Sequence, residues 1–121
     1  MNSINISVIS NRAHITLPAE DILYIALRDR KTVIHAAGDL IYETYTPISA
    51  LAHTLGSDFI RVDRGCLVSA RAIHGVTKTI DLINGESLDY ARRRKQEITA
   101  RLHTERQKLV QTLEQIGRAH V

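Results

Sequence analysis

The sequence contains a single cysteine, Cys66, among 121 residues, so it cannot form a disulfide within the chain and has no CxxC pair for zinc. It also has no stretch of the roughly 20 consecutive apolar residues that a membrane-spanning helix requires. Its N-terminus lacks the basic segment and long apolar run of a secretory signal. The length fits one domain, since a domain has about 150 residues. We therefore expect a single soluble domain in a reducing compartment, most simply the cytoplasm.

The sequence also lacks the residue patterns of common catalytic and cofactor sites. Its six histidines never occur in the HxH, HxxxH or HExxH spacings that bind metal ions. The few glycines form neither GxGxxG nor GxxxxGK, so no loop is suited to a nucleotide phosphate. Cys66 starts an apolar run, which favours a buried structural thiol over a nucleophile. We expect no enzyme activity, no metal and no cofactor.

Aromatic side chains are scarce, at 4% of the residues. They are Phe59 and four tyrosines, and they are not interleaved with basic residues as in proteins that stack unpaired bases. If the partner is a nucleic acid, duplex DNA therefore fits better than a single strand.

Positive charge is concentrated in the second half of the chain. Residues 1–60 carry four basic and six acidic side chains, a net charge of −2. Residues 61–108 carry eleven basic and six acidic side chains, a net charge of +5, and include four consecutive cations at 92–95. Such a block is typical of surfaces that bind polyanions, but it is also common on solvated helix starts. Charge alone leaves both interpretations open.

The first 45 residues have the pattern of strands. Apolar residues alternate with polar ones in the first strand, which is the period of a half-buried strand. The third run is almost continuously apolar, as in a strand buried on both faces. The expected elements are strands over 4–9, 14–17, 21–27, 32–36 and 40–45, with turns at 10–12, 28–31 and 37–39.

A short helix and further strands follow. Apolar residues at i, i+3, i+4 and i+7 predict a helix over 47–55, with Thr46 as its N-cap, Pro47 at its first position and Gly56 after its end. The dipeptide Asn84-Gly85 favours a two-residue type I′ turn, because both positions tolerate positive φ. Strands are expected over 59–62, 66–69, 73–77, 79–83 and 86–90.

A long terminal helix is expected from Ala91 to about Ile116, since this stretch has neither proline nor glycine. It would have about seven turns, of which a domain this small can cover only part. Glu105 and Thr112 interrupt a seam that is otherwise spaced like a coiled coil, so both a projecting helix and a homodimer remain open. The apolar stripe consists of Ile98, Leu102, Leu109, Leu113 and Ile116.

Four segments together resemble the LytTR DNA-binding domain of bacterial response regulators. The resemblance spans roughly residues 14–102 and implies a mainly β fold with minor α, made of small antiparallel sheets, one short helix and, here, a long C-terminal helix. It also implies that loops, rather than a recognition helix, enter successive major grooves of promoter DNA. We expect a DNA-binding domain over 1–102 and a helical extension over 103–121. The segments are DILYIALRDRKTVIH (21–35), ISALAHTLGSDFIRVDRG (48–65), CLVSARAIHGV (66–76) and LINGESLDYARRRKQEI (82–98).

Carried over residue by residue, the resemblance implies three places that contact DNA: the turn at 28–31, the RVDRG loop, and the arginines after the last strand. Arginine can donate two hydrogen bonds to guanine O6 and N7, and backbone phosphates attract any nearby cation. The DNA-binding residues implied are Arg28, Arg30, Lys31, Arg64, Arg92, Arg93 and Arg94.

The chain departs from the family pattern near these places. It has Asp63 where histidine is usual, Gly65 for serine, Ser69 for asparagine and Ala26 for glutamate. Asp63 would repel phosphate, and we expect it to pair with Arg64 in the free protein.

Two functions follow from the resemblance. The first is a bacterial transcription regulator that binds double-stranded promoter DNA in a sequence-specific manner. The receiver domain that usually precedes such a module does not fit within this length, so we expect a small stand-alone regulator controlled from elsewhere, or an excised output domain. The alternative is a protein-interaction module with weakened DNA binding, which acts on partner proteins through its terminal helix.

Overall fold

The computed structural model describes the backbone of residues 4–118 and the side chains of residues 4–114. A five-stranded antiparallel sheet of order β5-β4-β3-β7-β6 forms its centre, beside a β1–β2 hairpin and a three-stranded sheet of order β10-β9-β8. The strands are β1 (Asn5–Ser10), β2 (Ala13–Pro18), β3 (Ile22–Arg28), β4 (Lys31–Ala36), β5 (Leu40–Thr44), β6 (Phe59–Asp63), β7 (Cys66–Ser69), β8 (Ile73–Val76), β9 (Ile80–Leu82) and β10 (Ser87–Leu88). The helices are α1 (Ile48–Leu55) and α2 (Lys95–Arg118), and short 3-10 turns cover Ala19–Asp21, Gly56–Asp58, Ala70–Ala72 and Arg92–Arg94. The mainly β fold of small antiparallel sheets is confirmed.

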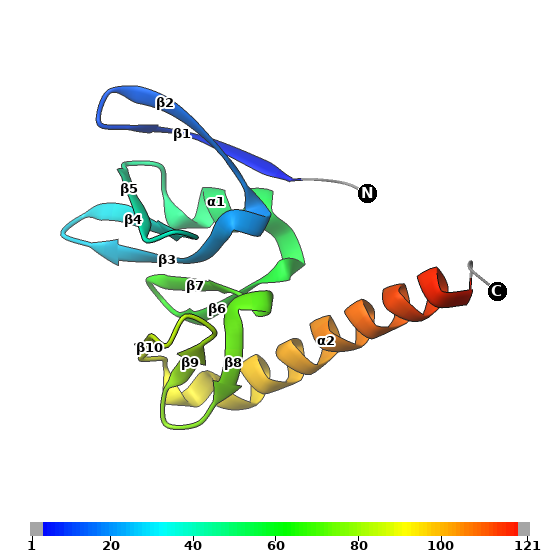
Figure 1. Cartoon of the computed structure of the whole chain (residues 1–121). Coiled ribbons are helices and arrows are strands. Elements are labelled where there is room, and N and C mark those ends of the chain that lie inside the picture. Colours follow the sequence, from blue (N-terminus) through cyan, green and yellow to red (C-terminus); the bar gives the residue numbers. More distant parts are fainter. Residues whose placement is uncertain (1–3, 119–121) are drawn as a thin grey trace.

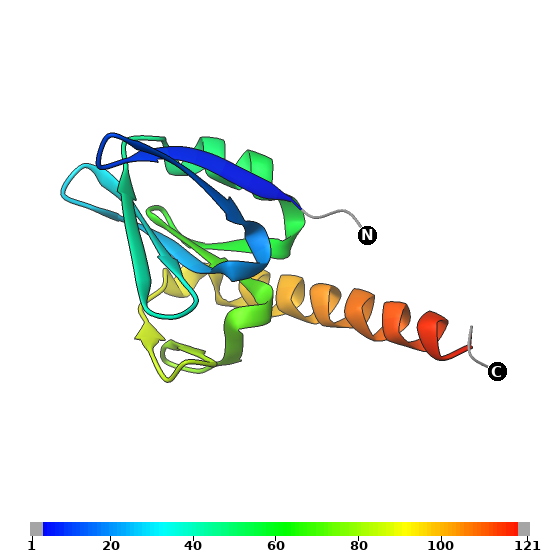
Figure 2. The ribbon, with the colours of Figure 1, turned by 45° about the horizontal axis from the view of Figure 1, so that its top comes forward.

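The central sheet is covered on both faces (Figure 1, Figure 2). The β1–β2 hairpin and α1 pack on one face, and β8–β10 with the start of α2 pack on the other. Ile25, 0% exposed, belongs to the first apolar cluster, whereas its neighbour Tyr24, 6% exposed, belongs to the second. The strand predicted to be buried on both faces is therefore confirmed. Each fully buried isoleucine or leucine of these clusters contributes roughly 1.5–3 kcal/mol to folding.

The N-terminus of α1 differs from the sequence prediction. Pro47 is the N-cap residue, and no side chain caps the helix. The predicted N-cap, Thr46, is engaged with β4 and β5, because its carbonyl accepts a hydrogen bond from Thr32 Oγ1 at 2.7 Å and its hydroxyl lies 3.2 Å from that of Thr44. Gly56 follows the last helical residue with φ of 74°, where a glycine is favoured, so the predicted end is confirmed.

The β9–β10 connection also differs. Gly85 N–H donates to the Leu82 carbonyl at 3.0 Å and Leu82 N–H donates to the Glu86 carbonyl at 2.8 Å, so the loop has three residues. Gly85 has φ of 90°, but Asn84 does not take positive φ. The predicted two-residue type I′ turn is wrong. Ile83 N–H donates to the Ala72 carbonyl at 2.9 Å, and this bond holds Ile83 in the wider loop, whose left-handed glycine is typical of three-residue hairpins.

α2 is one continuous helix over Lys95–Arg118, preceded by the 3-10 turn Arg92–Arg94. It passes without interruption through residues 102 and 103, and its distal half extends away from the sheets (Figure 1). Within the described part of the chain, neither helix is both long and apolar enough to span a membrane.

The predicted apolar stripe of α2 is divided between two environments. Ile98 and Leu102 are 0% and 5% exposed in the domain's own core. They are therefore not available to a homodimer interface, contrary to the prediction. Leu109 and Leu113 are 45% and 59% exposed, and the side chain of Ile116 lies outside the described side chains.

Candidate nucleic-acid interface

The β3–β4 turn carries three of the predicted cations. Arg28 pairs with Lys31 across the hairpin, and the two residues between them, Asp29 and Arg30, have φ of 51° and 68°. Positive φ at both central positions defines a type I′ turn, the narrowest connection that matches the twist of two strands. Arg28, Asp29 and Arg30 are exposed, and Lys31 is half-buried with its Nζ 3.3 Å from Glu43 Oε2.

The β6–β7 turn presents Arg64, whose side chain is exposed. Arg61 braces this turn, since its Nη2 donates to the Arg64 carbonyl at 2.7 Å and its Nε reaches the Asp63 carbonyl at 3.3 Å. Asp63 Oδ1 accepts the Arg64 N–H at 2.7 Å. Among the described side chains, the ion pairs are Lys31–Glu43 and Lys108–Glu105. The expected Asp63–Arg64 ion pair is therefore absent, because the Asp63 carboxylate bonds to the backbone of Arg64.

The first two turns lie side by side. β3 pairs with β7, with Ala26 opposite Cys66, and Leu27 N–H donates to the Gly65 carbonyl at 2.9 Å. A Cβ added to Gly65 would lie 3.1 Å from Leu27 Cδ1. Glycine at this position therefore permits the close approach of the β6–β7 turn to β3.

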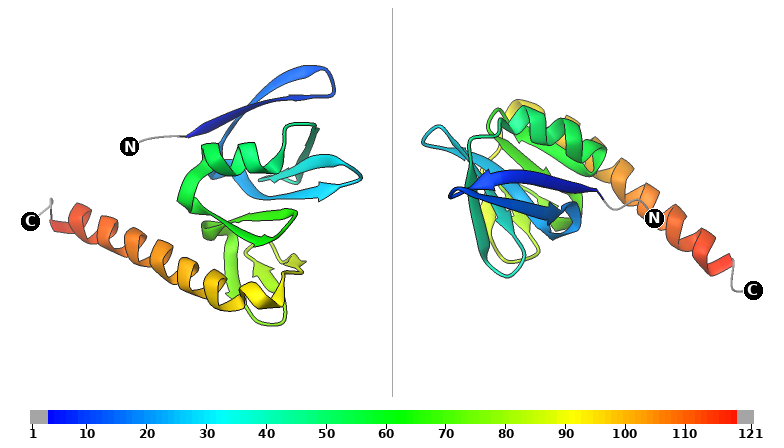
Figure 3. Two further views of the ribbon diagram at one scale, coloured as in Figure 1. Left: turned by 180° about the vertical axis from the view of Figure 1, so that it is seen from behind. Right: turned by 90° about the horizontal axis from the view of Figure 1, so that it is seen from above.

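The third basic segment reaches the same end of the sheet through β6. Ala91 N–H donates to the Val62 carbonyl at 3.0 Å, one residue before Asp63, which places the run 92–94 beside the end of that strand. Arg92 and Arg93 are exposed and Arg94 is half-buried. In Figure 1 the two turns and the start of α2 lie on the left, away from the C-terminal end of α2, and the rear view of Figure 3 shows the same arrangement reversed.

A family model described as the LytTr DNA-binding domain matches residues 12–115. This chain belongs to the LytTR DNA-binding domain family. Membership makes DNA the partner of the domain, supports a role in transcription regulation, and argues at the family level against an enzyme.

The LytTR fold of this chain is shared with a solved structure. It is the LytTr DNA-binding domain of a protein described as a methyl-accepting/DNA response regulator from Bacillus cereus, with a TM-score of 0.72 and 18% sequence identity. The similarity covers 84% of this chain and 98% of that chain. No curated protein matches this sequence.

Sequence reasoning missed Arg61 in this LytTR site. It lies in a strand and its function is to hold the backbone of the turn that presents Arg64. The RVDRG motif contains it, but nothing in the motif indicates that its guanidinium folds back on the turn.

Cys66 follows this turn and is not suited to nucleophilic chemistry. Burial, with a smaller effect from the negative charge of Asp63, raises the pKa of its thiol to about 12. Since the thiolate is the nucleophile, the thiol is inert near neutral pH, in agreement with the structural role predicted from the sequence.

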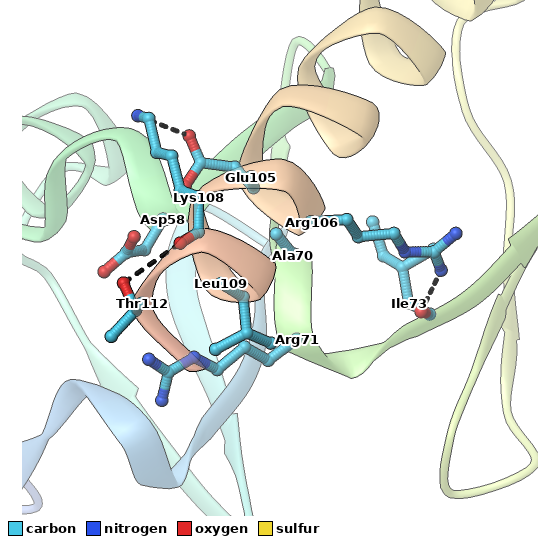
Figure 4. A pocket seen from close by; sticks show the side chains of 9 residues that line it. All are labelled: Asp58, Ala70, Arg71, Ile73, Glu105, Arg106, Lys108, Leu109 and Thr112. Carbon is cyan, nitrogen blue, oxygen red and sulfur yellow. Dashed lines mark hydrogen bonds and ion pairs between the residues drawn. The ribbon is translucent and has the colours of Figure 1, made fainter. Parts of the chain in front are cut away.

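A separate hollow lies beside α2 (Figure 4), and no residue of the three basic segments lines it. Arg106 spans its wall, with Nη2 donating to the Ile73 carbonyl at 3.1 Å, and Lys108 pairs with Glu105 at 3.1 Å. Glu105, Arg106 and Lys108 are thus engaged within the protein. Across the described residues, no three histidine, cysteine or acidic side chains come together in a way that could hold a metal ion.

Proposed function

We propose that this LytTR domain is a sequence-specific regulator of transcription that reads the major grooves of double-stranded promoter DNA with arginines on its turns. One observation carries the proposal: three basic segments that are far apart in the sequence lie along one end of the molecule. In the described structure, none of their arginines forms an ion pair. The residues concerned are Arg28, Arg30, Lys31, Arg64, Arg92, Arg93 and Arg94.

The geometry of the turns supports different roles for these residues. Arg64 projects from a turn that Arg61 and Asp63 hold in place. An arginine on a turn whose backbone is held in this way can donate two hydrogen bonds to a guanine, which specifies sequence. The run 92–94 presents several cations together, which suits phosphates, and phosphate contacts position a protein without reading the sequence.

The bacterial origin, the cytoplasmic location and the division into 1–102 and 103–121 belong to the same proposal. The exposure of Leu109 and Leu113 supports a separate role for the distal part of α2. Because Ile98 and Leu102 are buried in the core, the part of α2 with that role would begin after the helical turn that contains Leu102.

The proposal is tested by measuring the binding of the full chain to duplex promoter fragments across a series of salt concentrations. Log affinity should fall linearly with log salt, with a slope of roughly −0.9 for each phosphate contacted. The fragments should include the region upstream of the protein's own gene. Salt-independent binding, or none, would contradict a function in DNA recognition.

Arg64→Ala should reduce sequence discrimination more than overall affinity. Loss of one arginine–guanine pair costs roughly 1–3 kcal/mol of discrimination, equivalent to about 5–150-fold between specific and random duplexes. Competition between the two duplexes measures this ratio, with Arg71→Ala, an exposed arginine beside α2, as the control. A ratio equal to that of the wild type would make Arg64 a positioning contact.

As a second element of the proposal, the distal part of α2 mediates self-association. Leu109, Val110 and Leu113 are 45%, 48% and 59% exposed, and apolar groups on one projecting helix can pack against another chain. We expect sedimentation of the full chain to give a dimer, and a Leu109→Glu, Leu113→Glu double variant to give a monomer. A monomeric wild type would remove self-association, and capture of another protein by the same face would favour the alternative interaction module.

A further inference from the structure

A fourth basic turn lies on the same side of the molecule as the three described above (Figure 1, Figure 2). It joins β1 to β2 through Asn11 and Arg12, both exposed, between the paired residues Ser10 and Ala13. The sequence prediction of DNA-binding residues did not include Arg12.

The β1–β2 turn repeats the chemistry of the β3–β4 turn. Asn11 and Arg12 have φ of 50° and 65°, close to the 51° and 68° of Asp29 and Arg30. In both turns a short polar residue is followed by arginine in the left-handed region, where glycine is the unstrained choice. The positive φ follows from the type I′ geometry itself, but arginine in place of the usual glycine puts a cation at the same position of two turns on one side of the molecule.

A groove connects the two turns. It lies between the β1–β2 turn and the end of β5, and its lining includes Arg12, Lys31, Glu43 and Tyr45. Lys31 belongs both to the groove and to the β3–β4 turn, because it follows the two central residues of that turn and its Nζ lies 5.7 Å from the centre of the Tyr45 ring. The Tyr45 side chain is 78% exposed. The groove is therefore continuous with the DNA interface proposed above.

The β1–β2 turn is held in place by the core. Ile6, Val8 and Leu17 of this hairpin are 2%, 4% and 7% exposed within the apolar cluster that includes α1. The Ala19 N–H also donates to the Ile4 carbonyl at 2.7 Å at the open end of the hairpin. Arg12 thus extends from an anchored hairpin, as Arg64 does from the β6–β7 turn.

We propose that this groove binds a backbone phosphate of the DNA, beyond the base pairs that the β3–β4 turn contacts. Arg12 and Lys31 supply the positive charge, and the Tyr45 hydroxyl is a further donor of the kind that contacts phosphates. Glu43 opposes this charge, but its ion pair with Lys31 is exposed on both sides, 41% and 57%, so a phosphate can displace it at little cost. The inference rests on the proposed function in DNA binding.

Arg12→Gly tests the inference with a variant that should fold at least as well as the wild type. It creates Asn-Gly, the preferred type I′ pair, so the thermal midpoint should stay equal or rise while DNA binding weakens. On a duplex that extends well beyond the footprint at both ends, affinity should fall about three- to tenfold and the log–log salt slope should become shallower by roughly 0.9. Arg71→Ala, an exposed arginine outside the groove, should leave both values unchanged.

Shortened duplexes locate the contact. Removal of base pairs from the end nearest the β1–β2 turn should weaken wild-type binding and abolish the difference between wild type and Arg12→Gly. Removal from the other end should preserve that difference. Glu43→Gln should strengthen binding to the long duplex, because it removes the carboxylate that competes for Lys31.

The outcomes separate this inference from the proposed function. If Arg93→Ala weakens binding but Arg12→Gly changes neither affinity nor salt slope on the long duplex, the groove does not bind phosphate and the function stands. If the wild type shows no salt-dependent binding to any duplex, the proposed function fails first.

Discussion

Replacement of Arg92, Arg93 and Arg94 together by alanine should lower the affinity for duplex DNA by on the order of a hundredfold at about 0.15 M salt. Each phosphate contact contributes roughly 0.9 to the slope of log affinity against log salt, so three contacts change it by roughly 2.7. The structure places this run beside the end of β6 through the Ala91–Val62 hydrogen bond of 3.0 Å. Fluorescence anisotropy at several salt concentrations measures both values.

The same variant should retain its fold. Arg92 and Arg93 are exposed and Arg94 is half-buried, and surface substitutions of this kind usually change stability by no more than about 0.5 kcal/mol each. Thermal unfolding is therefore the control that separates lost contacts from lost structure. An unchanged salt slope in a folded triple variant would show that these three arginines do not contact DNA and are only solvent-exposed residues before α2.

Ile98→Ala should lower the free energy of unfolding by about 2–5 kcal/mol. Ile98 is 0% exposed and packs with the cluster between the central sheet and β8–β10, so removal of its side chain leaves a cavity as well as losing burial. Gln107→Ala on the same helix is the matched control. Gln107 is exposed and lies outside the proposed self-association face, so this substitution should change the free energy of unfolding by about 0.5 kcal/mol or less.

Urea unfolding of the two variants measures this difference. The Ile98 variant should also bind DNA less tightly, because the first turns of α2 fix the position of the preceding arginines. An equal decrease in the free energy of unfolding for the two substitutions would contradict the packing of the start of α2 against the sheets.

Local features of the fold were largely predictable from the sequence. Alternation of apolar residues located the strands around the turns at 10–12 and 28–31, and the apolar run over 21–27 identified a strand buried on both faces. Two local predictions were wrong because of contacts from elsewhere. Thr46 is held by Thr32, and the β9–β10 loop is widened by the bond from Ile83 to Ala72.

The arrangement of the site could not be predicted in the same way. Resemblance to the family indicated three basic segments, but their proximity depends on the pairing of β3 with β7, which joins residues about forty positions apart, such as Ala26 and Cys66. Arg61 and Arg12 were missed for a related reason. A guanidinium that braces a turn, or one that extends a surface across a groove, is recognised only when the neighbouring strands are in place.

The direction in which α2 leaves the domain has a consequence for binding thermodynamics. The exposed part of the helix, with Leu109 and Leu113, points away from the basic turns. A second molecule bound there adds no cation to the DNA surface and covers none. Its effect on promoter occupancy would therefore come through avidity. Once one domain of a linked pair is bound, the other is held near its own DNA site at a high effective concentration, while the intrinsic affinity of each domain remains that of the single domain.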